Sequence, residues 1–196
     1  HTDYSLVDGV NRVKKIAPHA ASLNMPALAL TDVTNFFALV KFFGSAKGAG
    51  VKPIFGSDLW IENPDKPSEP FRIAFLCINM KGYLHLTEII SQAFQENQHD
   101  EKAIIKKEWV IAKNEGLIML SGGLHGDAGV AISSERIELA QQITQEWVQG
   151  FGDRFYIELQ RTGRAGEQFY NDTVLGFAQS MQIPVVATND VVFMER

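Results

Sequence analysis

The strongest constraint on the fold is an alternation between short apolar runs and longer stretches with a helical pattern. The apolar runs are typical of strands covered on both faces, and they lie at 27–31, 52–61, 71–79, 116–121, 154–159 and 184–188. The helical patterns lie at 11–23, 35–48, 83–95, 106–112, 135–149 and 165–181. Strands joined by helices form right-handed βαβ units, so we predict an α/β domain with a mainly parallel sheet.

Acidic residues lie at or near the ends of four apolar runs, and these acids are Asp32, Asp58, Glu158 and Asp190. The opening segment HTDYSLVDG adds one imidazole, His1, and two more carboxylates, Asp3 and Asp8. Acids at the carboxyl ends of parallel strands are the usual layout of a barrel active site. We therefore expect a closed or nearly closed barrel, although an open doubly wound sheet would fit the same order of elements.

Nitrogen and sulfur ligands are missing beside these acids. A transition-metal site combines carboxylates with imidazole or thiolate, but the neighbouring positions hold Val33, Arg72, Gly123 and Val192. Among the histidines, His1 is the strongest candidate ligand, and His125, in a loop after the run at 116–121, is the second. The pattern indicates a site that has kept its scaffold and lost its metal chemistry.

Composition limits the class of protein and its partners. The chain has 196 residues, of which 45% are hydrophobic and 21% charged, as expected for one globular domain. Its net charge is −5, whereas a surface that binds nucleic acid through phosphates normally has a basic excess. The single cysteine, Cys77, excludes an internal disulfide and fits a reducing compartment. We expect a cytoplasmic domain that does not bind DNA by itself and has no membrane partner.

Two glycine-rich stretches, 44–50 and 121–129, lack the spacing of nucleotide-binding phosphate loops. We interpret the first as the C-cap of a helix and the second as a tight strand-to-helix turn.

The motifs HTDYSLVDG, KPIFGSDLW, EGLIMLSGG, FYIELQRTGR and IPVVATNDVVF appear in this order along the whole chain. Together they resemble the PHP (polymerase and histidinol phosphatase) domain at the N-terminus of the alpha subunit of bacterial DNA polymerase III. The resemblance implies a distorted barrel of seven strands and helices, with residues 1–196 as a single PHP domain. Because the chain opens on His1 in the middle of a motif, we expect a fragment of a longer polymerase subunit that lacks the first residues and part of the barrel.

In PHP domains that keep activity, the strand ends hold a multinuclear metal cluster of histidines, acids and often a cysteine. The resemblance assigns the surviving pocket positions to His1, Asp8, Asp32, Asp58 and Asp190. It assigns lost nitrogen or sulfur ligands to Val33, Arg72, Gly123 and Val192. All survivors except His1 are oxygen ligands, so we expect no tightly bound metal; His1, Asp8, Asp58 and Asp190 are candidates for weak Mg²⁺ binding at most.

Arg72 suggests how such a pocket remains stable without metal. Asp8, Asp58 and Asp190 would repel one another in a confined space, which costs stability. A guanidinium among them can form charge-assisted hydrogen bonds and replace the lost cation. We therefore expect Arg72 to lie in the pocket.

The resemblance implies that the full-length protein is a DNA-directed DNA polymerase, a nucleotidyltransferase, whose Mg²⁺ is bound outside this chain. It implies that this domain is a non-catalytic scaffold and docking site for the proofreading exonuclease (epsilon) subunit and the rest of the polymerase III core, reaching DNA only through the full-length protein. One alternative is an active metal-dependent phosphoesterase, either a pyrophosphatase or a 3′–5′ exonuclease. Another is a stand-alone PHP-like enzyme of small-molecule metabolism.

Overall fold

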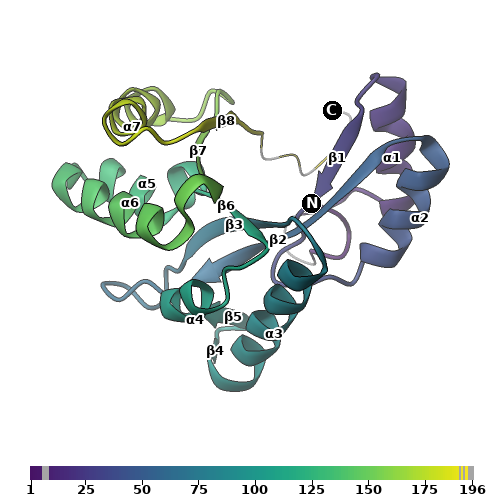
Figure 1. Cartoon of the computed structure of the whole chain (residues 1–196), viewed down its shortest axis with the longest axis horizontal. Helices are drawn as coiled ribbons and strands as arrows, with labels where there is room; N and C mark the ends of the chain where they lie inside the picture. The colour runs from purple at the N-terminus through teal and green to yellow at the C-terminus, as the bar shows by residue number, and fades with distance from the viewer. Residues whose placement is uncertain (6–8, 190, 192, 194–196) are drawn as a thin grey trace.

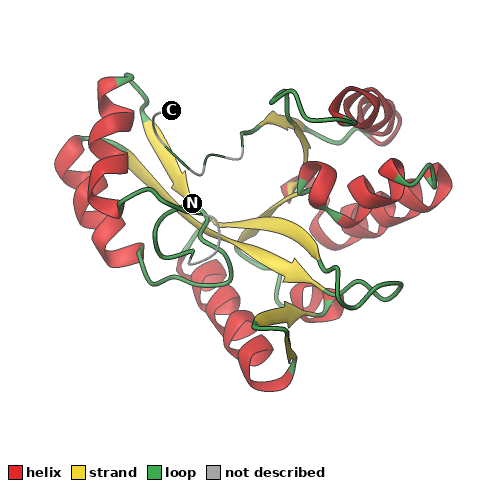
Figure 2. Cartoon of the chain, turned by 180° about the vertical axis from the view of Figure 1, so that it is seen from behind, coloured by secondary structure: helices red, strands yellow, loops and turns green. Residues whose placement is uncertain are grey.

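The computed structural model describes residues 1–5, 9–189, 191 and 193. Asp8, Asp190 and Val192, which belong to the predicted pocket, lie outside the described residues. The strands are β1 (Ala27–Leu30), β2 (Lys52–Ile61), β3 (Phe71–Cys77), β4 (Gln98–His99), β5 (Lys102–Ile105), β6 (Leu117–Leu120), β7 (Phe155–Leu159) and β8 (Val185–Ala187) (Figure 2). The α-helices are α1 (Val13–Ser22), α2 (Leu39–Ala49), α3 (Met80–Glu96), α4 (Lys107–Ala112), α5 (Asp127–Ser133), α6 (Ile137–Phe151) and α7 (Glu167–Met181), and η1 (Gly123–His125) and η2 (Gly152–Arg154) are short 3₁₀ helices.

The strands form one sheet in the order β4-β5-β2-β3-β6-β7-β8, with β1 also paired to β2 (Figure 1). The pairings β1–β2, β2–β5, β6–β7 and β7–β8 are parallel, as predicted for most of the sheet. β3 is antiparallel to both β2 and β6, because the loop 62–70 before it contains three prolines and no crossover helix. Within the described residues no pairing joins β8 to β1, so this part of the barrel wall is open.

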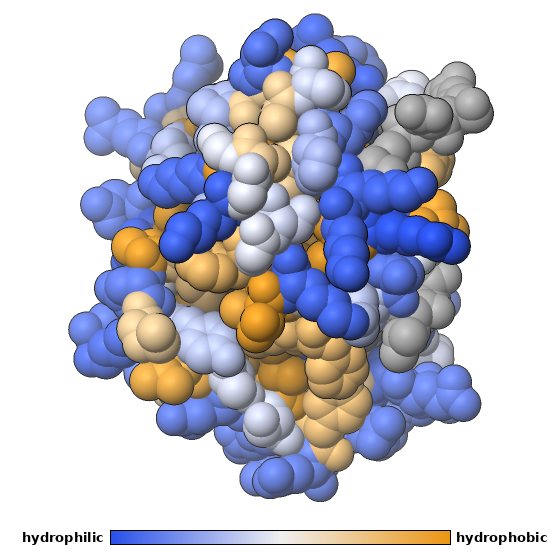
Figure 3. All heavy atoms as spheres, turned by 90° about the vertical axis from the view of Figure 1, so that its right-hand side faces the viewer, coloured by the Kyte–Doolittle hydropathy of each residue, from blue (hydrophilic) through white to orange (hydrophobic). Residues whose placement is uncertain are grey.

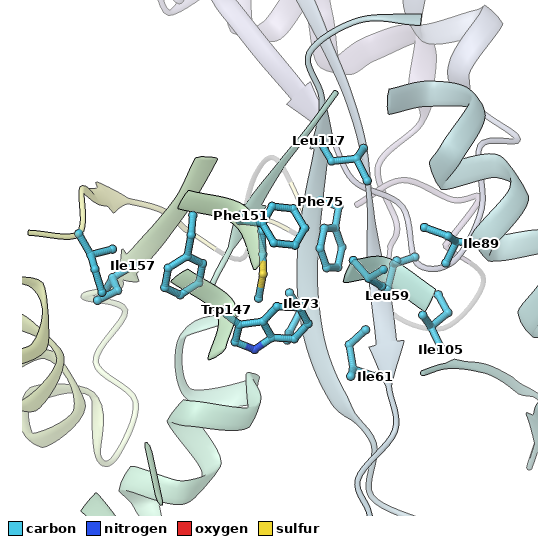
Figure 4. Packing of buried hydrophobic residues seen from close by; sticks show 14 of the residues in the cluster. Leu59, Ile61, Ile73, Phe75, Ile89, Ile105, Leu117, Trp147, Phe151 and Ile157 are labelled. Carbon is cyan, nitrogen blue, oxygen red and sulfur yellow. The ribbon is translucent and has the colours of Figure 1, made fainter. Parts of the chain in front are cut away.

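The larger hydrophobic core lies between the sheet and the helices α3, α5, α6 and α7. Phe151 on α6 points toward Phe75 on β3, with ring centroids 5.9 Å apart (Figure 4). Trp147, one turn earlier on the same helix, is 1% exposed and packs its ring 6.1 Å from that of Phe151. Burial of these aromatic rings therefore holds α6 against the middle of the sheet.

A smaller core fixes α1 and α2 beside β1, with Phe42 fully buried at its centre. The apolar segment 35–43 is divided between two environments. Phe37, Val40 and Phe43 are 67%, 79% and 47% exposed. Figure 3, which views the side of the molecule that carries α1 and α2, shows hydrophobic patches among hydrophilic side chains.

Several predicted elements are confirmed. β2 has the predicted bounds, α6 and α7 lie within two residues of theirs, and Gly50 ends α2 in the left-handed conformation at φ +71°. Within the described residues no helix is long and apolar enough to cross a bilayer.

Two elements differ from the ranges expected from the sequence. The helix expected at 35–48 begins at Leu39 without a side-chain cap, and Asn35 accepts a hydrogen bond from the amide of Phe37. The β4–β5 hairpin, which contains His99, was not among the predicted strands.

Two glycines allow α3 to approach the segment that leads into β6. A Cβ atom on Gly82 would overlap the carbonyl oxygen of Gly116, which itself adopts φ +78°. The amide of Gly82 also donates a hydrogen bond of 3.1 Å to Asn79 Oδ1, the N-cap of α3. The first turn of α3 is therefore packed backbone to backbone against a turn.

Gly82→Ala should lower the free energy of unfolding by about 1–3 kcal/mol, because the new methyl group requires two backbone segments to separate. The matched control is Gly48→Ala in α2, where a Cβ atom meets nothing within 4 Å. That change should raise the stability by about 0.5–1 kcal/mol through helix propensity. Urea denaturation followed by tryptophan fluorescence measures both, and equal effects would contradict this account of the close approach.

Candidate functional site

A cavity of about 440 Å³ opens where several strands and the N-terminal segment meet. Its polar wall comes from His1, Asp58 on β2, Arg72 on β3, His125 in η1 and Glu158 on β7. The segment after β8, which includes Thr188 and Asn189, closes another side. Residues far apart in the sequence are thus brought to one site.

Asp58 is the centre of the charged contacts in this cavity. Its Oδ2 atom lies 3.1 Å from His1 Nε2 and 3.3 Å from Arg72 Nε. The side chains of His1, Asp58 and Arg72 are 5%, 11% and 18% exposed, so solvent screens these contacts only weakly. One carboxylate oxygen is therefore shared by an imidazole and a guanidinium.

The antiparallel direction of β3 explains how Arg72 reaches Asp58. In the β2–β3 register, Asp58 lies opposite Ala74, and Arg72 lies opposite Trp60. Arg72 and Asp58 are diagonal neighbours, a separation that a long side chain spans easily. Asp58 also does not end its strand, since β2 continues to Ile61.

Asp32 has a structural role that differs from the role of Asp58. It is 2% exposed, does not line the cavity, and accepts hydrogen bonds from Thr2 N (2.6 Å), Thr2 Oγ1 (2.7 Å) and Ser5 Oγ (2.9 Å). Its carboxylate ties the N-terminal segment to the end of β1. All of these contacts are with donors of the protein itself.

Val33 and Gly123, at which the resemblance predicts lost ligands, are both buried. Val33 forms a backbone bridge to Asp58, and the amide of Thr34 donates to the Asp58 carbonyl oxygen at 2.8 Å. Gly123 begins η1 at φ +57°, where a Cβ atom would come within 3.3 Å of Gln160 Oε1. Neither position contributes a polar side chain to the cavity.

Glu158 is a buried cavity acid that the predicted pocket set did not include. It accepts hydrogen bonds from the amide of Gly122 (2.6 Å) and from Thr188 Oγ1 (2.7 Å). Burial raises the pKa of Glu158, and the nearby charge of Asp58 raises it further, although the two hydrogen bonds and Arg72 act in the opposite direction. The sequence indicated Glu158 only as one of the acids near the ends of the apolar runs, and the resemblance did not assign it to the pocket.

The donors among the described residues fit a transition-metal cluster poorly. Within residues 1–5, 9–189, 191 and 193, no group of three or more His, Cys, Asp or Glu side chains is placed to hold one ion. Asp58 is engaged by His1 and Arg72, and Glu158 by Gly122 and Thr188. We therefore derive no metal-dependent step from these residues.

The sequence of the chain is similar to a known domain family and to subunits of bacterial DNA polymerases. The model of the PHP domain family matches residues 1–162. The whole chain is 43% identical to part of the DNA polymerase III subunit alpha of Pseudomonas fluorescens, and 195 aligned residues are 41% identical to that of Escherichia coli K12. The chain spans only 17% of the length of each of these relatives.

Two solved structures have a similar fold. A predicted metal-dependent phosphoesterase from Bifidobacterium adolescentis superposes with a TM-score of 0.65 at 11% identity, over 95% of this chain and 84% of the other. An amidohydrolase from Chromobacterium violaceum, with bound sulfate and no metal, gives 0.62 at 12% identity, over 96% and 84%. At such identities the likeness concerns the fold alone.

Arg72→Ala should lower the free energy of unfolding by about 1.5–3 kcal/mol, because it leaves Asp58 in a confined site without its guanidinium partner. Arg72→Lys should restore only part of the loss, since an ammonium lacks the planar donor geometry. As a control, Lys66→Ala breaks the exposed pair with Glu69 and should change stability by less than about 0.5 kcal/mol. Thermal and urea denaturation measure these differences. An Arg72→Ala melt equal to that of the parent would contradict the assigned role of the ion pair.

Proposed function

Since this chain belongs to the PHP domain family and matches the N-terminal region of DNA polymerase III alpha subunits along its whole length, we propose that it serves such a subunit as a non-catalytic scaffold. Catalysis of DNA synthesis, with its Mg²⁺, belongs in this proposal to parts of the longer polypeptide outside the chain. The domain contributes shape, stability and a docking surface.

The contact between Arg72 and Asp58 is the observation that supports a non-catalytic role most strongly. A guanidinium beside the carboxylate supplies a fixed positive charge where a hydrolytic site would need a metal ion. Binding a divalent ion at Asp58 would require that this pair first separates and that two cations share one small space. Without a bound ion, no water is activated for attack on phosphorus.

The alternative function is a metal-dependent phosphoesterase. A cavity of about 440 Å³ is large enough for a phosphate ester. Among the described residues, His1, Asp58 and Glu158 are the candidate metal ligands for this function. The resemblance adds Asp8 and Asp190, which lie outside the described residues. The solved structure from Bifidobacterium adolescentis shows that a fold of this kind occurs in a protein described as a metal-dependent phosphoesterase.

The proposed partners are the proofreading exonuclease subunit and the other components of the polymerase III core. The similarity to alpha subunits, which covers the full length of this chain, supports membership of that assembly. Contact with DNA would occur through the longer protein, because the net charge of −5 disfavours phosphate binding by this domain.

The purified chain, incubated with Mn²⁺ or Zn²⁺ and then dialysed, should retain far less than one metal ion per chain by ICP mass spectrometry. It should also release no more phosphate from pyrophosphate, and no more nucleotide from a DNA 3′ end, than an Asp58→Asn control. Restoring nitrogen and sulfur donors with Val33→His, Arg72→His, Gly123→Cys and Val192→His should increase the metal content. Stoichiometric metal in the parent chain, with turnover lost in Asp58→Asn, would establish the phosphoesterase instead.

For the docking role, we expect the chain to form a complex with the proofreading exonuclease subunit of the same organism in sedimentation velocity experiments. Arg72→Lys is the matched control, because it alters the cavity and keeps the net charge; its affinity should equal that of the parent. Absence of a complex at about 100 µM, where even weak association is detectable, would rule out direct docking by this domain.

A further inference from the structure

A second hollow, of about 350 Å³, lies among the end of β2, the loop after it, α5 and α6. It shares no lining residue with the cavity around Asp58. Beyond the ion pair of Lys107 with Glu146, a more open hollow of about 410 Å³ continues between α4 and the end of α6. Lys107 and Glu146 border both hollows, which together form what we call the α4–α6 groove.

One residue that lines the first hollow is a buried acid, Asp127, in the first turn of α5. Asp127 is 7% exposed and accepts one hydrogen bond on each oxygen, from Trp147 Nε1 at 2.8 Å and from the amide of Ala128 at 2.9 Å. Both donors are neutral. Burial of a carboxylate disfavours its charged form, and a positive charge at hydrogen-bond distance would stabilise the anion further.

The cations nearest to this carboxylate are already engaged. Lys107 Nζ lies 2.8 Å from Glu146 Oε2 and 4.3 Å from the centroid of the Trp147 ring. Arg136 Nη1 lies 2.9 Å from Asp65 Oδ2. Among the described residues, no ion pair involves Asp127, and burial raises its pKa even though the charge of Lys107 lowers it.

The excess of carboxylates in the first hollow favours a positively charged ligand. The lining of the first hollow has four carboxylates, those of Glu62, Asp65, Asp127 and Glu146, and two cations, those of Lys107 and Arg136. After the two ion pairs are formed, Glu62 and Asp127 remain to attract a positive charge. Apolar side chains from β3 and α6, namely Phe71, Leu139 and Ile143, line the same hollow and suit the aliphatic stem of a long cationic side chain.

We propose that the α4–α6 groove binds a partner polypeptide through an arginine or lysine side chain, whose charged head pairs with Asp127 and whose stem packs against Leu139 and Ile143. The extension of the groove along α6, past Lys107 to Gly150, favours an extended peptide over a compact small molecule. This inference does not depend on the identity of the polymerase partners.

Selection of random twelve-residue peptides displayed on phage tests the proposal. Peptides enriched on the chain should contain Arg or Lys flanked by apolar residues. Their dissociation constants should rise at least tenfold with Asp127→Asn, which keeps the size of the side chain and an acceptor for Trp147 but removes the charge. Glu138→Gln, which removes one exposed charge from the same helix α6 outside the groove, should leave affinity unchanged.

Replacing the cationic residue of the best peptide by citrulline gives the same test without altering the protein, so it remains decisive if Asp127→Asn fails to fold. The citrulline peptide should also bind at least tenfold more weakly. The proposal is overturned if no peptide is enriched, if folded Asp127→Asn or the citrulline peptide binds as well, or if arginine amide alone binds as tightly as the peptide. The last result would assign the hollow to small organic cations.

Discussion

The fold depends on β2, the strand that connects both hydrophobic cores and carries the central acid of the cavity. Residues 52–55 pair with β1, which packs with α1 and α2, and residues 56–61 pair with β3, which lies under α6. Trp60 and Ile61 also pair with β5. At Gly56 the β3 backbone approaches so closely that a Cβ atom would overlap the carbonyl oxygen of Phe75. Because one continuous strand links these parts, Asp58 occupies a fixed position.

Two acids of the cavity are stabilised in different ways. The carboxylate of Asp58 forms an ion pair with the guanidinium of Arg72, and the imidazole of His1 contacts the same oxygen. Glu158 accepts hydrogen bonds mainly from neutral donors, and burial raises its pKa. An acid whose pKa is raised on folding favours the native state most at low pH, and this contribution is lost as the pH rises toward its folded pKa. The contribution of Glu158 to the stability of the fold therefore decreases as the pH rises.

The sequence contained most of the information about the elements and less about their contacts. Helices α6 and α7 and strand β2 follow from hydrophobic periodicity, which is a local property. The hairpin β4–β5 was missed because its turn uses Asp100 and Glu101 at positive φ, where glycine or asparagine is usual. Helix α5 has seven residues rich in glycine and alanine, too few for an amphipathic period. The contact of Arg72 with Asp58 depends on the reversed direction of β3, which local patterns do not specify.

The separate roles of the acids explain how a pocket of this kind can lose nitrogen and sulfur donors and keep carboxylates. Asp32 accepts hydrogen bonds from Thr2 and Ser5, and its removal would leave these buried donors unsatisfied. Glu158 joins β7 to Gly122 and Thr188, and its removal would leave two partly buried donors without this acceptor. The printed hydrogen bonds of Val33 and Gly123 are made by their backbones, so a change of side chain there removes none of them. If a domain of this kind no longer had to catalyse a reaction, its scaffold would still require the acids. An acid-lined barrel end is therefore weaker evidence for a metal site than the imidazoles and thiolates beside it.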